Sequence, residues 1–333
     1  MRLVALAVAL GGCLTPPSLA VSGEPVPVVC ETTGSAVLAG ELGVAPTFDG
    51  ATLVWVPPGG GALHSQRFSR EARPVSAAVV VWPGAFQHAV VATVDDQVVA
   101  GAVAGDVTVM VSAPLGIAPF RELAILGGLA GPSPMVVAGG QRVSTTVSYG
   151  GLLVNGFDDK LGVHTSELAV LTTPSLEVAA TAVGPHAIAA WSTDDACYTE
   201  RIFGVGSGAT AVEAGPCHAP RIASNGSDVA LVFERPDGIY LARGTADALH
   251  PASAIRIAAG SAPRIVASGG GFWVSYLDET GTIAAGSIGA DLELRTVALA
   301  GAPISHELAV VGDLPRVFAA DQRGITISTL CLE

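Results

Sequence analysis

Short apolar runs separated by turn residues dominate the chain, and the stretch 219–260 shows this pattern clearly. It contains four runs rich in Ala, Val, Ile and Leu: APRIAS, VALVFE, GIYLARG and ASAIRIAA. They are separated by Asn-Gly-Ser-Asp, Pro-Asp-Gly and an Asp-Ala-Leu-His-Pro segment. Apolar runs of this length, bounded by such turns, predict four short strands. The pattern begins again at 262 with APRIVAS, so the four-strand unit is repeated.

The same unit recurs along the chain. The turn between its second and third strands appears seven times, at intervals of about 43 to 46 residues. These turns lie near Pro58-Gly59, Gly105-Asp106, Tyr149-Gly150, Asp194-Asp195, Asp237-Gly238, Thr280-Gly281 and Gln322-Arg323. Few strands alternate strictly between apolar and polar residues, which indicates sheets covered on both faces. The sequence therefore predicts an all-β fold over residues 25–333, a seven-bladed β-propeller with four antiparallel strands per blade.

The last unit has only three strands before the end of the printed sequence. The run Pro25-Val26-Pro27-Val28-Val29-Cys30 has no partner of its own, and pairing it with the last blade removes an open sheet edge. We therefore expect the N-terminal strand to complete the seventh blade. That arrangement places Cys30 beside Cys331, where a disulfide would close the ring.

A second cysteine pair is expected in the fourth unit. Residues Gly206-Ser207-Gly208 form a turn, and Cys197 and Cys217 are equally distant from Ser207. Four cysteines outside the first 20 residues allow three pairings. The hairpin favours Cys197–Cys217 as a cross-strand bridge, which leaves Cys30–Cys331 as the other. An even number of cysteines in an exported chain is typical of such a framework.

The first 20 residues predict an export signal, with Arg2 preceding the apolar run 3–10. Two processing sites compete. Leu10-Gly11-Gly12-Cys13 resembles a bacterial lipobox, which would make Cys13 a lipidated first residue, and this site is favoured because it directly follows the apolar run. Cleavage after Ala20 would instead release a soluble protein. A third interpretation is an ordinary buried N-terminal strand.

The net charge of −13 limits the kinds of partner that the protein is expected to bind. Binding to nucleic acid or to an anionic membrane needs a basic surface, so the charge argues against both. Outside the leader, no uninterrupted apolar run reaches the ~18 residues of a membrane span. Membrane contact is therefore expected only through a lipid anchor, and the protein is expected at the outer membrane or cell surface, or free in the periplasm or medium.

Four basic side chains open the first strand of their units: His88, Arg221, Arg264 and His306. In a propeller this places them around the mouth of the central channel. There they could hold an anion, such as a carboxylate or phosphate, through bidentate arginine contacts. The alternative is that they cap strand ends or pair with acids on nearby turns.

Other candidate sites have simpler explanations. Aspartates in the predicted turns could bind calcium, but hairpin turns favour Asp and Gly anyway. A repeated aromatic position, Trp55, Trp191, Phe233, Tyr276 and Phe318, could stack on sugars but is better explained as core. We find no nucleophile elbow, phosphate-binding loop or complete zinc-protease motif, and no cofactor or metal is predicted.

The repeat period and strand pattern resemble the seven-bladed β-propeller superfamily, and specifically secreted or lipid-anchored bacterial propellers, over about residues 25–333. The Gly-His and Trp-Asp pairs of WD repeats are missing. The resemblance implies a non-enzymatic binding or scaffold module at the cell envelope, with an envelope protein or a small anionic ligand as partner. The alternative is a hydrolase or lyase that acts on a glycan or anionic substrate at the channel mouth.

Overall fold

The computed structural model describes residues 25–333 except 38, 128–132, 149–150, 158–162, 171–176, 194–195, 203–211, 214, 290 and 300. The predicted leader, with the lipobox ending at Cys13, lies outside the described residues. So do the predicted turns at Tyr149-Gly150, Asp194-Asp195 and Gly206-Ser207-Gly208.

The described residues form 28 strands in seven four-stranded antiparallel sheets. The first strands of the sheets are β2 (Leu42–Thr47), β6 (His88–Val94), β10 (Val136–Ala138), β14 (Glu177–Val183), β18 (His218–Ser224), β22 (Ser261–Ser268) and β26 (Ser305–Val311). The second strands are β3 (Gly50–Trp55), β7 (Gln97–Ala104), β11 (Gln141–Ser148), β15 (His186–Ser192), β19 (Asp228–Arg235), β23 (Gly271–Leu277) and β27 (Leu314–Asp321). The third strands are β4 (Gly61–Ser69), β8 (Val107–Pro114), β12 (Gly151–Phe157), β16 (Cys197–Ile202), β20 (Gly238–Thr245), β24 (Ile283–Ile288) and β28 (Gly324–Leu332). The fourth strands are β5 (Val79–Phe86), β9 (Arg121–Gly127), β13 (Val163–Val170), β17 (Val212–Glu213), β21 (Ile255–Ala258), β25 (Leu294–Ala298) and β1 (Pro27–Ser35).

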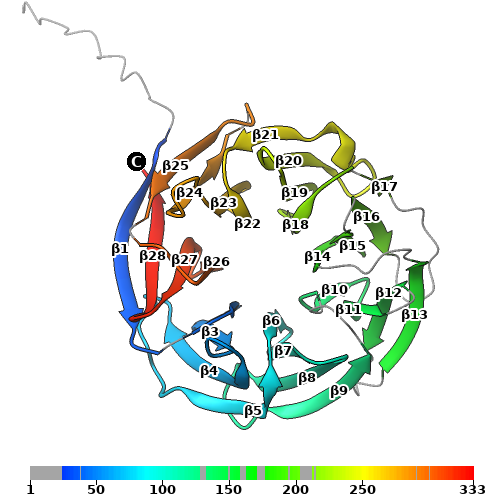
Figure 1. Ribbon diagram of the computed structural model, residues 1–333, viewed down its shortest axis with the longest axis vertical. Coiled ribbons are helices and arrows are strands. Elements are labelled where there is room, and N and C mark those ends of the chain that lie inside the picture. The colour runs from blue at the N-terminus through cyan, green and yellow to red at the C-terminus, as the bar shows by residue number, and fades with distance from the viewer. Residues whose placement is uncertain are drawn as a thin grey trace, which may run out of the picture.

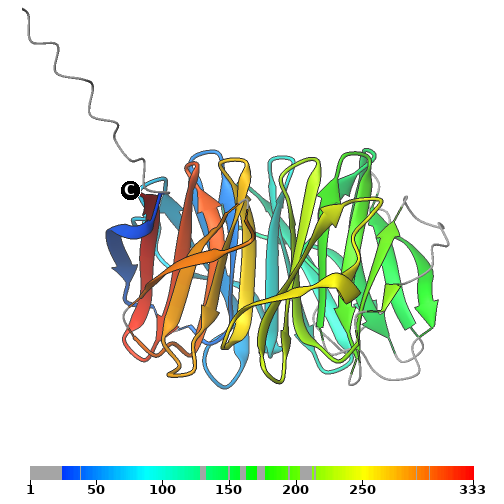
Figure 2. The ribbon, with the colours of Figure 1, turned by 90° about the horizontal axis from the view of Figure 1, so that it is seen from above.

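The seven sheets stand side by side in a ring, with their first strands around the centre and their fourth strands outside (Figure 1). Figure 2 shows the ring from its edge, with hairpin connections at both ends of the sheets. The predicted seven-bladed propeller is confirmed, including four antiparallel strands in each blade. No helix among the described residues is long and apolar enough to cross a membrane.

Burial between neighbouring blades explains why the strands do not alternate in polarity. In β19 five consecutive side chains, Val229 to Phe233, are fully buried. Val229, Leu231 and Phe233 pack into the cluster shared with the fourth blade, whereas Ala230 and Val232 pack into the cluster shared with the sixth. Since successive side chains of a strand point to opposite faces, a blade covered on both sides needs apolar residues at every position.

The N-terminal strand closes the ring as predicted. β1 pairs antiparallel with β28 in the blade formed by β26 and β27, with Val28 opposite Cys331 (Figure 1). Cys30 lies at a bulge between Val29 and Glu31, and its disulfide to Cys331 joins Cα atoms 5.9 Å apart. A covalent bond therefore reinforces the point where the first and last strands meet.

The bridge Cys197–Cys217 is also present, with Cα atoms 5.4 Å apart, but its predicted register is wrong. β16 pairs Tyr198 with Glu213, so Cys217 lies beyond the end of β17, directly before β18. The bridge therefore links the third strand of one blade to the connection that enters the next blade. The symmetric hairpin assumed about Ser207 placed Cys217 inside the fourth strand.

One strand boundary also differs from the sequence expectation. The fourth strand of the fifth blade was expected at 252–259, whereas the chain forms a short 3-10 helix, η1 (Pro251–Ser253), before β21 begins at Ile255. Proline at the first helical position has a φ angle already suited to a helical turn. Pro251 therefore starts a turn where the residue composition alone indicated a strand.

Candidate functional site

The candidate site lies on the first strands, which surround the centre of the ring. His88 begins β6, and His306 is the second residue of β26. Arg221 and Arg264 belong to the same local structure in β18 and β22, an Ala-Pro-Arg sequence at a register shift. The alanine before each proline has a positive φ, 48° at Ala219 and 52° at Ala262. Each shift is a β-bulge, a feature that redirects the side chains following it.

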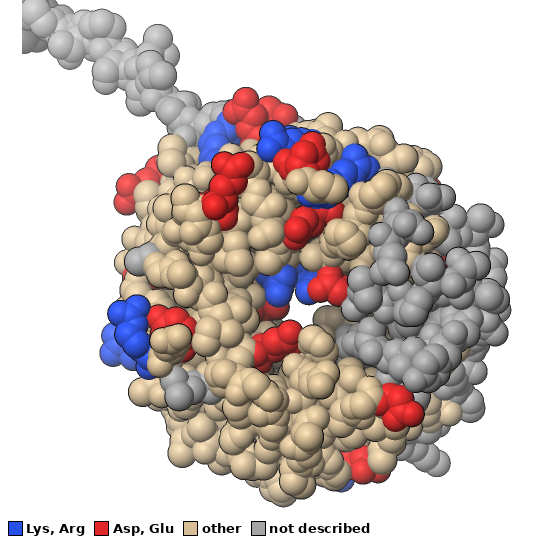
Figure 3. All heavy atoms as spheres, in the orientation of Figure 1, with Lys and Arg blue, Asp and Glu red and all other residues tan. Residues whose placement is uncertain are grey.

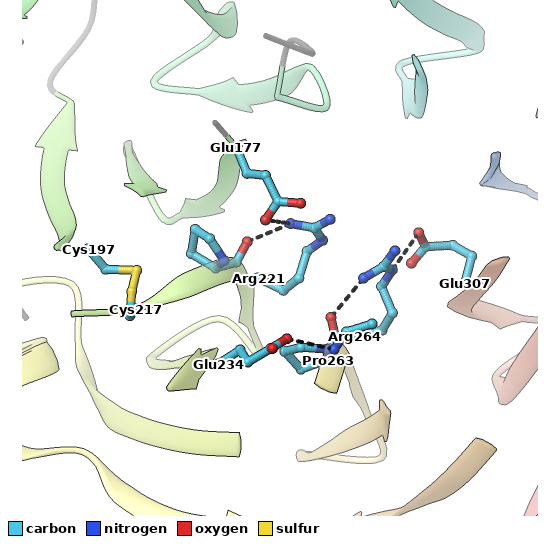
Figure 4. Close-up of polar contacts among 10 residues, drawn as sticks. Glu177, Cys197, Cys217, Arg221, Glu234, Pro263, Arg264 and Glu307 are labelled. Carbon is cyan, nitrogen blue, oxygen red and sulfur yellow. Dashed lines mark hydrogen bonds and ion pairs between the residues drawn. A yellow bond between two sulfur atoms is a disulfide. The ribbon is translucent and has the colours of Figure 1, made fainter. Parts of the chain in front are cut away.

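The Arg221 guanidinium is held from two sides in this arrangement. Its Nη1 donates a hydrogen bond of 2.9 Å to the carbonyl of Pro220 and lies 3.7 Å from Oε2 of Glu177 on β14 (Figure 4). No described residue accepts a hydrogen bond from its Nε or Nη2. The side chain is 27% exposed, so these donors have access to solvent in the channel.

Arg264 repeats the backbone contact but uses a different acidic partner. Its Nη1 donates to the carbonyl of Pro263 at 2.9 Å, and its Nε donates to Oε2 of Glu307 on β26 at 3.1 Å (Figure 4). Glu234 accepts a 3.0 Å hydrogen bond from the amide of Ala262, which holds the bulge in place. Among the described residues, Nη2 of Arg264 has no acceptor.

The two guanidiniums are close enough to influence each other. Burial lowers the pKa of Arg221, and the positive charge of Arg264 lowers it further. Glu177, Glu307 and Glu41 act in the opposite direction and raise it. Two like charges in a partly dehydrated channel form an arrangement that a bound anion would stabilise.

His88 pairs with an acid on the neighbouring blade. Its Nδ1 lies 2.6 Å from Oε2 of Glu41, which directly precedes β2, and both side chains are about half exposed. This hydrogen bond raises the pKa of His88 although burial lowers it, and the charges of Glu41 and Glu177 raise it further. Glu177 lies on the fourth blade and His88 on the second, so these charges interact between blades that are not neighbours.

His306 does not face the channel as expected. Its side chain is buried, with 2% of the residue exposed, and no described residue is a hydrogen-bond partner of Nε2. Burial and, to a smaller extent, the positive charges of Arg264 and Arg221 together lower its pKa to about 3, although a hydrogen bond with the backbone of Ser275 acts in the opposite direction. The imidazole is therefore neutral near pH 7. The side chain that faces Arg264 from β26 is Glu307, one residue further along.

The three glutamates Glu41, Glu177 and Glu307 were missed in the sequence. Each lies at or near the start of a first strand, as the predicted basic residues do. Their spacing from the preceding turns could have suggested this position, but their pairing depends on which blades become neighbours. Figure 3 shows the result, an opening through the centre of the ring with basic and acidic side chains at its wall.

The other candidate residues have structural roles. The repeated aromatic residues are buried, and Trp191 and Phe233 stack on tyrosines of the adjoining strands. Turn aspartates bond within their own turns: Asp278 accepts hydrogen bonds from Thr280, and Asp321 accepts them from Arg323. Within the described part of the chain, no group of three or more His, Cys, Asp or Glu residues is placed to hold a metal ion.

Comparison with known proteins identifies the fold. No protein-family model matches the sequence, and no curated protein matches it. Among solved structures, the crystal structure of the WD40 domain from Toxoplasma gondii coronin aligns with a TM-score of 0.56 over 93% of this chain and 88% of that chain. The chain is a seven-bladed β-propeller. At 15% sequence identity, the likeness of this propeller to the coronin domain extends to the fold alone.

Proposed function

We propose that this propeller is an exported, non-enzymatic binding module of the bacterial cell envelope, which takes an anionic ligand at the mouth of its channel. The supporting observation is the Arg221–Arg264 pair, because two nitrogens of Arg221, Nε and Nη2, have no hydrogen-bond acceptor among the described residues. A carboxylate or phosphate group would accept from both and would reduce the repulsion between the two guanidiniums.

The proposed location at the cell envelope rests on the cysteines and on the N-terminal leader. Two disulfides favour an oxidising compartment, since bridges of this kind are rare in the cytosol. The sequence Leu10-Gly11-Gly12-Cys13 provides a lipid attachment site, and cleavage after Ala20 provides the soluble alternative. A rigid closed ring with many loops also suits an envelope protein as partner.

Intact-mass analysis of the protein from membrane and soluble fractions tests this location. We expect a diacylglyceryl adduct on Cys13 in the membrane fraction, and Cys13→Ala should move the protein to the soluble fraction. If the protein is cleaved after Ala20, the proposed export still holds but the lipid anchor at Cys13 is excluded. An uncleaved chain with reduced cysteines in the cytosol would contradict the proposed location at the cell envelope.

Titration with acetate, succinate and inorganic phosphate tests the anion site. We expect at least one of them to bind, and Arg221→Gln to weaken that binding about tenfold or more, the effect of losing a charge-assisted bidentate contact. Arg121→Gln is the control, because Arg121 is an exposed residue of the outer strand β9. Equal binding by both variants would exclude Arg221 as the anion ligand.

The alternative of a hydrolase or lyase is not favoured by a specific observation. It would need His88 and His306 to act on the substrate together with the two arginines at the channel mouth. His306 is buried and has a pKa of about 3, so a substrate in the channel would not reach it. His88 forms a hydrogen bond with Glu41 at the channel, where it can contribute to binding.

A further inference from the structure

The charges around the channel restrict the kind of anion that the proposed site can take. Among the described residues, the ion pairs at the channel join three carboxylates, two guanidiniums and one imidazole: Glu41, Glu177, Glu307, Arg221, Arg264 and His88. Counting these charges gives −1 with a neutral imidazole and zero with a protonated one. A dianion entering this group would add two negative charges near three existing carboxylates, which costs Coulomb energy.

The donors that remain available are directed to one region. Glu177 and Glu307 lie on opposite sides of the arginine pair, and the guanidiniums lie between them (Figure 4). Nε and Nη2 of Arg221 form the edge of the guanidinium that binds a carboxylate with two parallel hydrogen bonds. Nη2 of Arg264 is the neighbouring donor that the contacts to Pro263 and Glu307 leave available within the described structure.

A negative group lies on the other side of the channel. Glu41 and His88 belong to the first and second blades, whereas Arg221 and Arg264 belong to the fifth and sixth. The side chain of Glu41 is 48% exposed, so it remains accessible beside the imidazole. Glu41 directly precedes the first strand β2, and Arg221 lies on the first strand β18. These strands surround the centre of the same ring, so one small molecule could contact both sides (Figure 1). An ammonium group near Glu41 would offset its charge.

We infer that the ligand of this channel is zwitterionic, with a carboxylate bound between Arg221 and Arg264 and a cationic amine facing Glu41. This inference rests on the proposed anion site and specifies its ligand class. A zwitterion satisfies the arginine donors without adding net charge to the group. A plain carboxylate supplies the first interaction but lacks the second, and a plain amine lacks the first.

A matched series of small probes tests the inference on the full propeller. Ligand-observed NMR near neutral pH would compare ω-amino acids from glycine to aminohexanoate with carboxylates and amines of the same chain lengths. We expect one chain length to bind as the amino acid about tenfold more tightly than as the carboxylate, the contribution of one added charge-assisted contact. Chain length should matter because the arginines and Glu41 are fixed on a rigid ring.

Three variants separate the contributions of the arginine and of Glu41. Arg221→Gln should weaken amino acids and carboxylates alike, and Arg221→Lys should recover part of the loss because it keeps the charge without the two-donor edge. Glu41→Gln should weaken only the amino acids, to the affinity of the matching carboxylates. Arg121→Gln and Glu122→Gln, both on the exposed outer strand β9, are the controls. Thermal unfolding of each variant would show that the ring is intact.

The outcomes distinguish this inference from the function on which it rests. If carboxylates bind as tightly as the matching amino acids, or if Glu41→Gln has no effect, the ligand is an anion and the zwitterion is excluded. The proposed anion site then stands. If no amino acid or carboxylate binds, and the acetate, succinate and phosphate titrations also show no binding, both the inference and the anion site are wrong.

Discussion

Cys30 and Cys331 are joined by a disulfide although 301 residues separate them in the sequence. The bond connects the strand that completes the seventh blade to the strand beside it. The disulfide therefore adds a covalent link to the strand pairing that closes the ring around the channel. This relationship leads to the first prediction.

Removing the Cys30–Cys331 bridge should destabilise the protein more than removing Cys197–Cys217. Chain-entropy arguments give about 5 to 6 kcal/mol for the larger loop and about 3 kcal/mol for the loop of 20 residues. Urea unfolding of the Cys30→Ser/Cys331→Ser and Cys197→Ser/Cys217→Ser double variants measures the difference. A smaller loss for the first pair would show that the ring does not need the bridge.

The buried, neutral His306 should make the folded protein less stable in acid. Its folded pKa of about 3 lies below the ordinary value of 6.5, so only the unfolded chain takes up a proton between these values. The free energy of unfolding should fall by up to about 1.4 kcal/mol per pH unit as the pH drops below 6.5. His306→Gln should reduce this slope in urea unfolding relative to the unsubstituted protein. Identical slopes in the two proteins would contradict a neutral buried His306.

His88 should titrate in the opposite direction. Its hydrogen bond to Glu41 raises its pKa above 6.5, so the stability it contributes is present below 6.5 and lost as the pH rises through the folded pKa. An NMR titration of the imidazole protons should give a pKa above 6.5, and Glu41→Gln should lower it. If Glu41→Gln leaves the pKa of His88 unchanged, the two side chains do not form the ion pair described at the channel.

Two alanines offer a test of the repeated bulge. Ala219 and Ala262 have positive φ angles, a conformation that is strained for residues with a Cβ. Ala219→Gly and Ala262→Gly should each raise the free energy of unfolding by roughly 0.5 to 1 kcal/mol, after the entropic cost of glycine. Ala267→Gly, in the regular part of β22, should lower it. Destabilisation by all three substitutions would argue against the bulges.

The sequence predicted the ring well because its evidence is repeated. Seven turns at similar intervals predict seven sheets. The seventh sheet lacks a fourth strand, and the unpaired strand that ends at Cys30 can supply it. These inferences depend on period and strand count, which small errors in strand boundaries do not change. The position of Cys217 relative to the strands was harder to predict from the sequence, because β17 is only two residues long and ends before the cysteine.

The site was harder to predict because it depends on single-residue register. A shift of one residue turns a side chain to the other face of a strand. Bulges shift the register before Arg221 and Arg264, whereas β26 has no such shift. The position that faces Arg264 is therefore occupied by Glu307, and His306 points into the protein. Pairs between blades, such as Glu41 with His88, also require knowledge of the assembled ring.

Peptide mapping of the protein, isolated from its native cells under non-reducing conditions, tests the closed ring most directly. The account predicts two linked peptide pairs, one containing Cys30 and Cys331 and the other Cys197 and Cys217. Four free thiols, or a link between Cys30 and either Cys197 or Cys217, would contradict the closed ring and the export that the disulfides support.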